Sequence, residues 1–207
     1  VTPVVTTFAG SGSNAHANGT GTAASFSNPS GVAIDRSGNV YVAEVSSYIR
    51  KITPEGIVTT LAGSGNHGYA DGTGTAASFS QPRGVAVNEN GIIYVTDGAN
   101  HRIRKITSGG VVTTFAGSGS QNLVDATGTA ASFKTPYGVA VDGSGNVYVA
   151  DHAIRKIMPE GVVTTLAGGG GGYYADGEGT AASFYYPHGV ALDGSGNVYV
   201  ADAHNHR

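Results

Sequence analysis

The six residues GTAASF constrain this chain more than any other feature, because they occur four times without a change. The copies lie at Gly21–Phe26, Gly74–Phe79, Gly128–Phe133 and Gly179–Phe184. Aligning the chain on them aligns everything between them, with a period of 51 to 54 residues. A fixed period of this length indicates a repeat architecture in which each repeat is one supersecondary unit.

Each repeat contains four short runs that are rich in β-branched and aromatic residues, as strands are. In the second repeat these runs are Gly84–Asn88, Gly91–Thr96, Ile103–Ile106 and Val111–Gly117. Turn sequences such as DGSGN and TPEG join the runs, because Asp and Asn close Asx turns and Gly supplies positive φ. Each repeat is therefore predicted to be a four-stranded antiparallel meander.

The second run of each repeat is apolar at nearly every position, as in Val147–Ala150. A strand with one face in water would alternate between apolar and polar residues. Sheets that bury both faces can stack around an axis, so we predict an all-β fold, a β-propeller of four-stranded blades. A flat solenoid is the rival, but it needs polar capping repeats, and the end units here are ordinary copies.

The two ends of the chain suggest how the ring closes. VTPVVTTFAG at the start matches a fourth strand, and GVALDGSGNVYVADAHNHR at the end holds a first and a second strand. We expect one domain over 1–207, its ring closed by the N-terminal strand. The predicted blade units are approximately 27–63, 80–117, 134–168, and 185–207 completed by 1–10. Such a ring closes with four units; the alternatives are pairing with another chain and a place in a larger ring.

The pattern P-x-G-V-A-V-D, then G-N-V-Y-V-A-D, then N-H-R-I-R-K-I resembles the NHL repeat. The family's triplet matches Asn100–Arg102 and Asn205–Arg207, and it is altered at Ser46–Tyr48 and Asp151–Ala153. The resemblance implies a propeller with the GVAVD strand innermost and the VTTLAG strand outermost. Members of the NHL-repeat family include RNA-binding, protein-interaction and adhesion domains, and lyases or lactonase-like enzymes with a metal in the channel. The YADGTGTAASF segment looks like a bacterial, secreted subgroup.

Composition limits the classes of function. The net charge of −3 and a pI near 6.1 give no general attraction to nucleic acid. There is no cysteine, which excludes disulfides and thiolate chemistry, and no apolar run of membrane-spanning length. The abundance of Gly, Ser, Thr, Ala and Asn is typical of a secreted bacterial surface protein. We therefore expect an extracellular or cell-surface location, without membrane insertion.

Some polar and aromatic residues recur in every copy. The second strand ends in Glu44, Asp97, Asp151 and Asp202, and the third strand carries Arg50, Arg104 and Arg155. Repetition in every copy favours a structural ion-pair ring over catalysis. We expect Phe26, Phe79, Phe133 and Phe184 to plug the junctions between blades, and the threonine of GTAASF to cap a helical turn. Asn18, Asp71, Asp125 and Asp176 are predicted to cap the same turn, with cation binding as the alternative.

Positions that differ between copies are the candidates for function. The residue between Pro and Gly before each first strand is different in every repeat, and the residues just upstream also vary. The candidate rim at the channel mouth comprises Ser30, Arg83, Lys134, Tyr137, Tyr185, Tyr186 and His188. Tyrosine supplies large contact area at low entropy cost, so such a rim suits a glycan or a peptide. Drift of unconstrained surface positions is the alternative.

No catalytic signature is present: the chain has no G-x-S-x-G elbow and no H-E-x-x-H. Its histidines lie at inconsistent repeat positions, so we expect neither a metal nor another cofactor, with calcium or zinc as the alternative. The sequence predicts a non-catalytic binding or assembly scaffold of a bacterial extracellular protein. Its partner would be a protein or glycan, with self-association through the incomplete last blade. The alternatives are a structural subunit and a metal-dependent lyase or lactonase-like enzyme.

Overall fold

The computed structural model describes residues 2–169 and 171–207. Within them, three five-stranded antiparallel sheets and one two-stranded sheet follow each other along the chain. The first sheet has the order β1-β5-β4-β3-β2, and the next two repeat it as β6-β10-β9-β8-β7 and β11-β15-β14-β13-β12. The last sheet pairs β16 with β17. Each sheet is one blade.

The strand bounds follow the predicted runs closely. The first blade comprises β1 (Gly19–Thr20), β2 (Pro29–Ile34), β3 (Val40–Glu44), β4 (Tyr48–Ile52) and β5 (Ile57–Ala62). The second comprises β6 (Gly72–Thr73), β7 (Pro82–Val87), β8 (Ile93–Asp97), β9 (Arg102–Ile106) and β10 (Val111–Ala116). The third comprises β11 (Ala126–Thr127), β12 (Val139–Val141), β13 (Val147–Asp151), β14 (Ala153–Ile157) and β15 (Val162–Ala167). The fourth has β16 (Pro187–Leu192) and β17 (Val198–Asp202).

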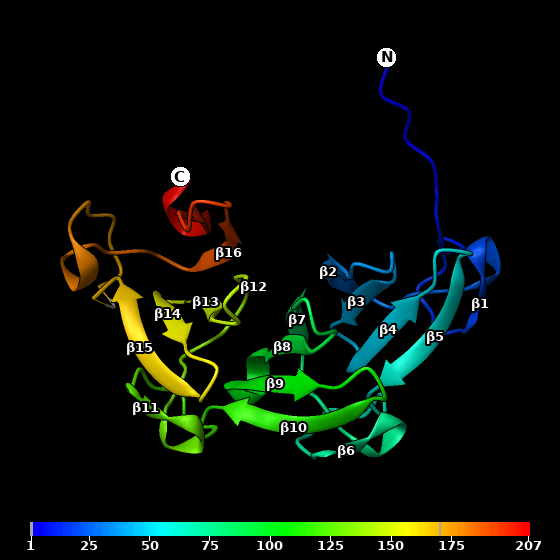
Figure 1. Ribbon diagram of the computed structural model, residues 1–207, viewed down its shortest axis with the longest axis horizontal. Coiled ribbons are helices and arrows are strands. Elements are labelled where there is room, and N and C mark those ends of the chain that lie inside the picture. Colours follow the sequence, from blue (N-terminus) through cyan, green and yellow to red (C-terminus); the bar gives the residue numbers. More distant parts are fainter. Residues whose placement is uncertain (1, 170) are drawn as a thin grey trace.

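The blades are arranged as an open arc (Figure 1). Strands β2, β7, β12 and β16 lie side by side on its concave side, and β5, β10 and β15 lie on the outside. This confirms the all-β propeller architecture and the prediction that the GVAVD strand is innermost. No helix among the described residues has the length and apolar character needed to span a membrane.

Glycine allows the inner strands to approach so closely. A Cβ atom on Gly31 would lie 2.3 Å from the carbonyl oxygen of Arg83, and one on Gly84 would lie 2.5 Å from that of Tyr137. Any larger residue would push adjacent blades apart, which is why the P-x-G-V sequence recurs at each inner strand. The hairpins between first and second strands are the predicted Asx turns, as in Asp35, whose Oδ1 accepts the Ser37 and Asn39 N–H groups at 2.9 Å.

The GTA of each GTAASF forms a single 3₁₀ turn. The four turns are η1 (Gly21–Ala23), η2 (Gly74–Ala76), η4 (Gly128–Ala130) and η5 (Gly179–Ala181), and two others, η3 (Gly98–Asn100) and η6 (Ala203–Asn205), follow second strands. No side chain caps these turns, so the predicted threonine cap was wrong. Backbone holds them instead: Gly21, at φ +55°, donates its N–H to the Gly56 carbonyl at 2.9 Å. The two-residue strands β1, β6 and β11, which precede η1, η2 and η4, add to each of these blades a fifth strand that the predicted meander lacked.

The phenylalanines of GTAASF lie between blades. Phe79 is fully buried against Ala43 and Ile49 of the first blade and Val95 of the second. Phe133 is equally buried between the second and third blades. Phe26 and Phe184, by contrast, are only partly buried.

The N-terminal run does not complete the last blade, so the predicted closure of the ring is not found (residue 1 lies outside the described residues). Residues 2–10 form no strand, and Val4 and Val5 are 82% and 96% exposed. Gly10 and Ser11 instead donate N–H bonds to the Gly21 and Ala24 carbonyls, which tie this run to the first blade. The last blade also lacks the third strand on which a fourth would pair, and the two chain ends lie on either side of the arc's opening (Figure 1).

Candidate functional site

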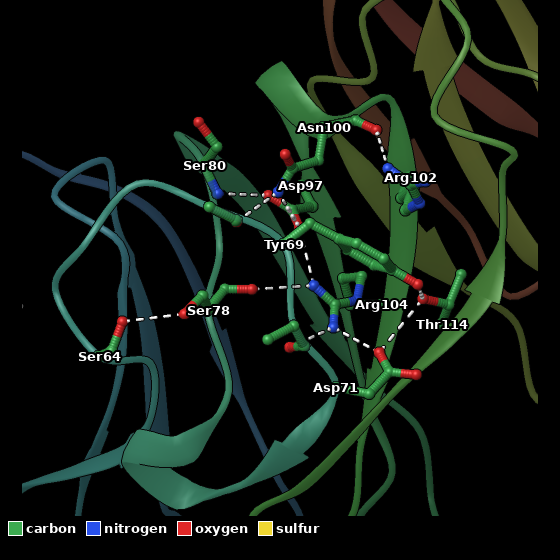
Figure 2. Close-up of polar contacts among 12 residues, drawn as sticks. Ser64, Tyr69, Asp71, Ser78, Ser80, Asp97, Asn100, Arg102, Arg104 and Thr114 are labelled. Carbon is green, nitrogen blue, oxygen red and sulfur yellow. Dashed lines mark hydrogen bonds and ion pairs between the residues drawn. The ribbon is translucent and has the colours of Figure 1, made fainter.

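A buried arginine connects the third strand of each five-stranded blade to the loop before GTAASF, as Figure 2 shows for Arg104. Its Nη1 donates to Asp97 Oδ2 at 2.9 Å and to the Ser78 carbonyl at 3.1 Å. Its Nη2 donates to Asp71 Oδ1 at 2.6 Å and to the Ala70 carbonyl at 2.9 Å. Both Arg104 and Asp97 have fully buried side chains. A charge removed from water needs several such partners, and here both terminal nitrogens have them, whereas Nε has none among the described residues.

The other two five-stranded blades repeat this arrangement. Arg50 Nη1 donates to Glu44 Oε1 at 2.7 Å, while its Nη2 donates to Asn18 Oδ1 at 2.9 Å. Arg155 lies 3.6 Å from Asp151 and donates to Asp125 Oδ1 at 2.6 Å. The acids that end the second strands thus meet the repeated arginines. Asp202 instead accepts the Tyr185 N–H at 2.8 Å and an Asn205 amide hydrogen at 2.6 Å.

The predicted turn-capping role of Asn18, Asp71 and Asp125 was wrong. Each of their side chains accepts a hydrogen bond from the Nη2 of the buried arginine. Each also accepts one from a threonine hydroxyl of the VTT run, as Asp71 does from Thr114 at 3.2 Å. No side chain caps the 3₁₀ turn, and its first residue donates to backbone, as Gly74 does to the Gly110 carbonyl at 2.9 Å. The cation-binding alternative for these positions stays a prediction.

The third blade differs in how its acid is held. Asp151 accepts the Lys134 N–H at 2.9 Å, and Arg155 is further from it than Arg104 is from Asp97. Burial raises the pKa of the Asp151 carboxyl to about 6, against the opposing effects of these backbone bonds and of Arg155. Burial also raises the pKa of Asp97.

A stacked pair of side chains, found in three of the four repeats, was missed from the sequence. His16 stacks on Tyr48 at 3.6 Å, Arg102 lies over Tyr69 at 3.9 Å, and Arg207 lies over Tyr174 at 3.9 Å. These residues occupy the same two repeat positions, which hold Leu123 and Ala153 in the third repeat. The signal was available: the two positions change together between repeats, as contacting residues do.

At the channel mouth, the residues that vary between Pro and Gly form a continuous row. Ser30 Oγ donates to the Arg83 carbonyl at 2.7 Å, and the Arg83 guanidinium lies 4.3 Å from the centre of the Tyr137 ring. Tyr137 stacks on His188 with centroids 4.3 Å apart and planes 14° apart. The four predicted rim positions are therefore brought together in order around the arc.

The remaining rim residues extend this row. Tyr186 lies 4.7 Å from His204 and 4.5 Å from His152, and Tyr185 meets Tyr186 edge-on at 5.0 Å. His204 lies 5.9 Å from His188. Burial, and then the nearby charge of Lys134, lower the pKa of His152. His152 and His204 were missed as members of the rim, because only the loop contacts bring them there.

Thr96 fixes the spacing of the row, and it too was missed. Its buried hydroxyl accepts the Gly84 N–H at 2.7 Å and donates to the Tyr137 carbonyl at 2.6 Å. The other repeats have alanine at this position. The hydroxyl therefore joins the second and third inner strands directly below Arg83 and Tyr137.

A cavity of about 380 Å³ lies along the inner strands under this row. Ser30, Arg83, Tyr137 and His188 line it together with the glycines and valines that follow them. Among residues 2–169 and 171–207, no three His, Cys, Asp or Glu side chains are arranged to hold a metal ion. The geometry offers cationic, aromatic and hydroxyl groups around one concave surface.

Comparison with known proteins agrees with this architecture. The NHL repeat family model matches residues 79–106 and 184–207, and the Teneurin NHL domain model matches residues 8–72. The chain is 38% identical over 98 residues to chicken (Gallus gallus) NHL repeat-containing protein 2, a match that covers 46% of this chain and 13% of that protein.

Two solved structures from Bacteroides have similar folds. A protein of unknown function from Bacteroides thetaiotaomicron superposes with a TM-score of 0.73 and 26% identity, covering 86% of this chain and 45% of that one. An auxiliary nutrient binding protein from Bacteroides ovatus gives a TM-score of 0.69 and 22% identity, covering 90% and 48%. The chain thus spans a small part of its sequence relative and about half of each solved structure. The chain carries NHL repeats on a β-propeller scaffold.

Proposed function

We propose that this chain is a non-catalytic binding module that takes its ligand on the rim at the channel mouth. The rim comprises Ser30, Arg83, Lys134, Tyr137, Tyr185, Tyr186 and His188, with His152 and His204 beside them. One observation carries the proposal. The residues between Pro and Gly, which differ in every repeat, line one cavity together, whereas the recurring phenylalanines Phe79 and Phe133 and the recurring arginines are buried in packing.

The chemistry of the rim supports binding. Aromatic rings with polar handles and a cationic guanidinium are the groups that dominate binding surfaces. A cavity of about 380 Å³ falls within the range of small-ligand sites. Similarity to an auxiliary nutrient binding protein is consistent with such a role. We propose a glycan or a protein segment as partner, and an extracellular or cell-surface location in a bacterium.

The test is a binding screen with a variant that makes the repeats alike. Replacing Arg83, Tyr137 and His188 by serine gives every repeat the residue found at Ser30. We call this the rim-to-serine variant. Glycan and peptide arrays probed with wild-type protein should give a defined set of binders, all lost in the variant. A control variant carries Arg36→Ser, just after inner strand β2, and Tyr199→Ser, near the start of β17. Both positions lie at the ends of these strands that are away from the rim, so the control should keep the binders.

Two results would contradict the proposal: binding that survives in the rim-to-serine variant, or binding that the control loses equally. Metal analysis of the purified protein addresses the enzyme alternative. A stoichiometric channel metal, together with lyase or lactonase turnover, would replace the binding module by a channel-centred enzyme.

Assembly is a second candidate function, favoured by the exposed faces at both ends of the arc. A groove of about 410 Å³ on the first blade is lined by Phe8, Phe26, Val32, Val42 and Ile52 among others. At the other end Tyr199 is 59% exposed, whereas the matching Tyr41 and Tyr94 are buried. Apolar faces and free strand edges favour contact with a further chain. Light scattering over a concentration series should show oligomers, and monomers at every concentration would exclude this function.

A further inference from the structure

We infer that the rim recognises an acidic saccharide, with Arg83 and the neighbouring imidazoles holding its carboxylate and the tyrosine rings holding its sugar faces. This inference rests on the proposed function and names the ligand class for the same surface. Four properties of the rim carry it: its charge, the position of Arg83 beside the cavity, its stacked rings and the size of the cavity.

The rim is cationic on a molecule that is acidic as a whole. Arg83 and Lys134 are basic residues, and His152 and His188 lie beside them, while the net charge of the chain is −3. The carboxylates that contact rim segments, Asp151 and Asp202, are buried and already accept backbone N–H groups. A local excess of positive groups beside a concave surface favours an anionic ligand.

Arg83 is held in position but not saturated. Its guanidinium lies over the Tyr137 ring, and its Nη2 donates to Gln81 Oε1 at 3.1 Å. Its Nε is buried and has no hydrogen-bond partner among the described residues, as is also true of Arg50, Arg104 and Arg155, so this nitrogen is not specific to the rim. Arg83 is, however, one of the residues that line the cavity. The planar fork of an arginine suits a carboxylate better than any neutral group.

The rings favour a saccharide over an acidic peptide. Tyr137 and His188 stack nearly parallel, and Tyr185 and Tyr186 continue the aromatic surface. Their flat faces match the C–H face of a pyranose, and their hydroxyls match its alcohols. The cavity of about 380 Å³ lies within the range of small-ligand sites and admits a few sugar units. A glutamate side chain would use the arginine but leave the rings without contact.

The inference also predicts how binding varies with pH. Burial, then the charges of His204 and Arg83, lower the pKa of His188 below 6.5. Arg83, Tyr137 and His204 are the groups that face it. His188 is therefore neutral at pH 7 and gains its proton only below pH 6.5. A uronate, which stays ionised in this range, should bind more tightly as the pH falls from 7.5 to 5.5.

The experiment is calorimetric titration of the whole chain with matched oligomers: trisaccharides of galacturonate, glucuronate and mannuronate, neutral galactotriose, and a tripeptide of glutamate. We expect at least one uronate to bind at least tenfold more tightly than galactotriose, and more tightly at pH 5.5 than at 7.5. Arg83→Gln should weaken uronate binding about tenfold, whereas Arg36→Gln should leave it unchanged.

Other outcomes overturn the inference. Equal affinity for galactotriose would exclude recognition of the charge, and binding of the glutamate peptide alone would assign the rim to acidic protein segments. Lack of binding by all three uronates would exclude the saccharide class. In each of these cases, rim-dependent binders on the arrays would still support the broader binding module, so the two failures are distinguishable.

Discussion

At the junctions between blades the four repeats are identical in sequence, whereas at the channel mouth each repeat has its own residue. The junction residues Phe79, Phe133 and Arg104 are fully buried. The mouth residues Arg83, Tyr137 and His188 contact one another around a cavity. The same packing contacts recur at each junction, so the same residues are used there in every repeat. A ligand breaks the symmetry of the arc, so its contacts differ from blade to blade.

The largest effect expected at a junction is that of Arg104→Ala. It leaves the buried Asp97 carboxylate and two backbone carbonyls without their donor, and breaking a buried pair costs about 3–5 kcal/mol. The free energy of unfolding in urea measures this loss. Lys105→Ala, at the next position of the same strand, should cost less than about 1 kcal/mol. Equal costs for the two variants would contradict a structural role for the arginine.

Phe133→Ala should follow, with a loss of about 3–5 kcal/mol from a fully buried aromatic ring. Phe184→Ala should cost clearly less, because Phe184 is only partly buried beside a blade that has two strands. Thermal and urea unfolding of the two variants measure the difference. Equal losses of stability in the two variants would mean that the contribution of the phenylalanine does not depend on its burial between two complete blades.

A smaller effect is expected from Asp151 in the third blade, which should make the free energy of unfolding depend on pH. The folded pKa of Asp151, about 6, exceeds that of an ordinary Asp, so the folded state binds this proton more tightly. Its stabilising effect is complete below about pH 4 and is lost as the pH rises through 6, on the order of 1 kcal/mol per pH unit. Asp151→Asn should flatten that slope between pH 4 and 6. An unchanged slope would mean that Asp151 does not titrate there.

The smallest stability effects are expected at the mouth. Arg83→Ser and His188→Ser each remove a stacking contact with Tyr137, and Tyr137→Ser removes both, at positions that are not buried, so each should cost less than about 1 kcal/mol. Urea unfolding of the single variants checks this. A loss as large as that of Phe133→Ala at any of the three would place that residue with the junctions.

The repeat period and local turn chemistry were sufficient to predict most of the fold. Strand β9 was expected at Ile103–Ile106 and lies at Arg102–Ile106, because the run and its turn define it locally. The strand expected within the N-terminal VTPVVTTFAG does not form among residues 2–10, since a strand needs a neighbour that its own sequence cannot supply. The role of Asp71 was mispredicted for the same reason: its partner Arg104 is distant in sequence.

The candidate rim was predicted in part. Its members at Ser30, Arg83, Tyr137 and His188 follow from one repeat position, so variation within the chain revealed them. His204 reaches the rim from the turn after β17, and Thr96 supports it from a second strand. Tertiary contacts alone bring these two residues there, so no repeat position marked them as members.

The most direct test of the account compares ligand affinity in the rim-to-serine variant with that in Phe133→Leu, a junction variant chosen to stay folded. The measurement is calorimetric titration with the tightest array binder, beside the urea midpoint of each protein. We predict that the rim-to-serine variant loses affinity with little change in midpoint, while Phe133→Leu loses stability and keeps wild-type affinity. Retained affinity in the rim-to-serine variant, or lost affinity in folded Phe133→Leu, would contradict the separation of packing from binding.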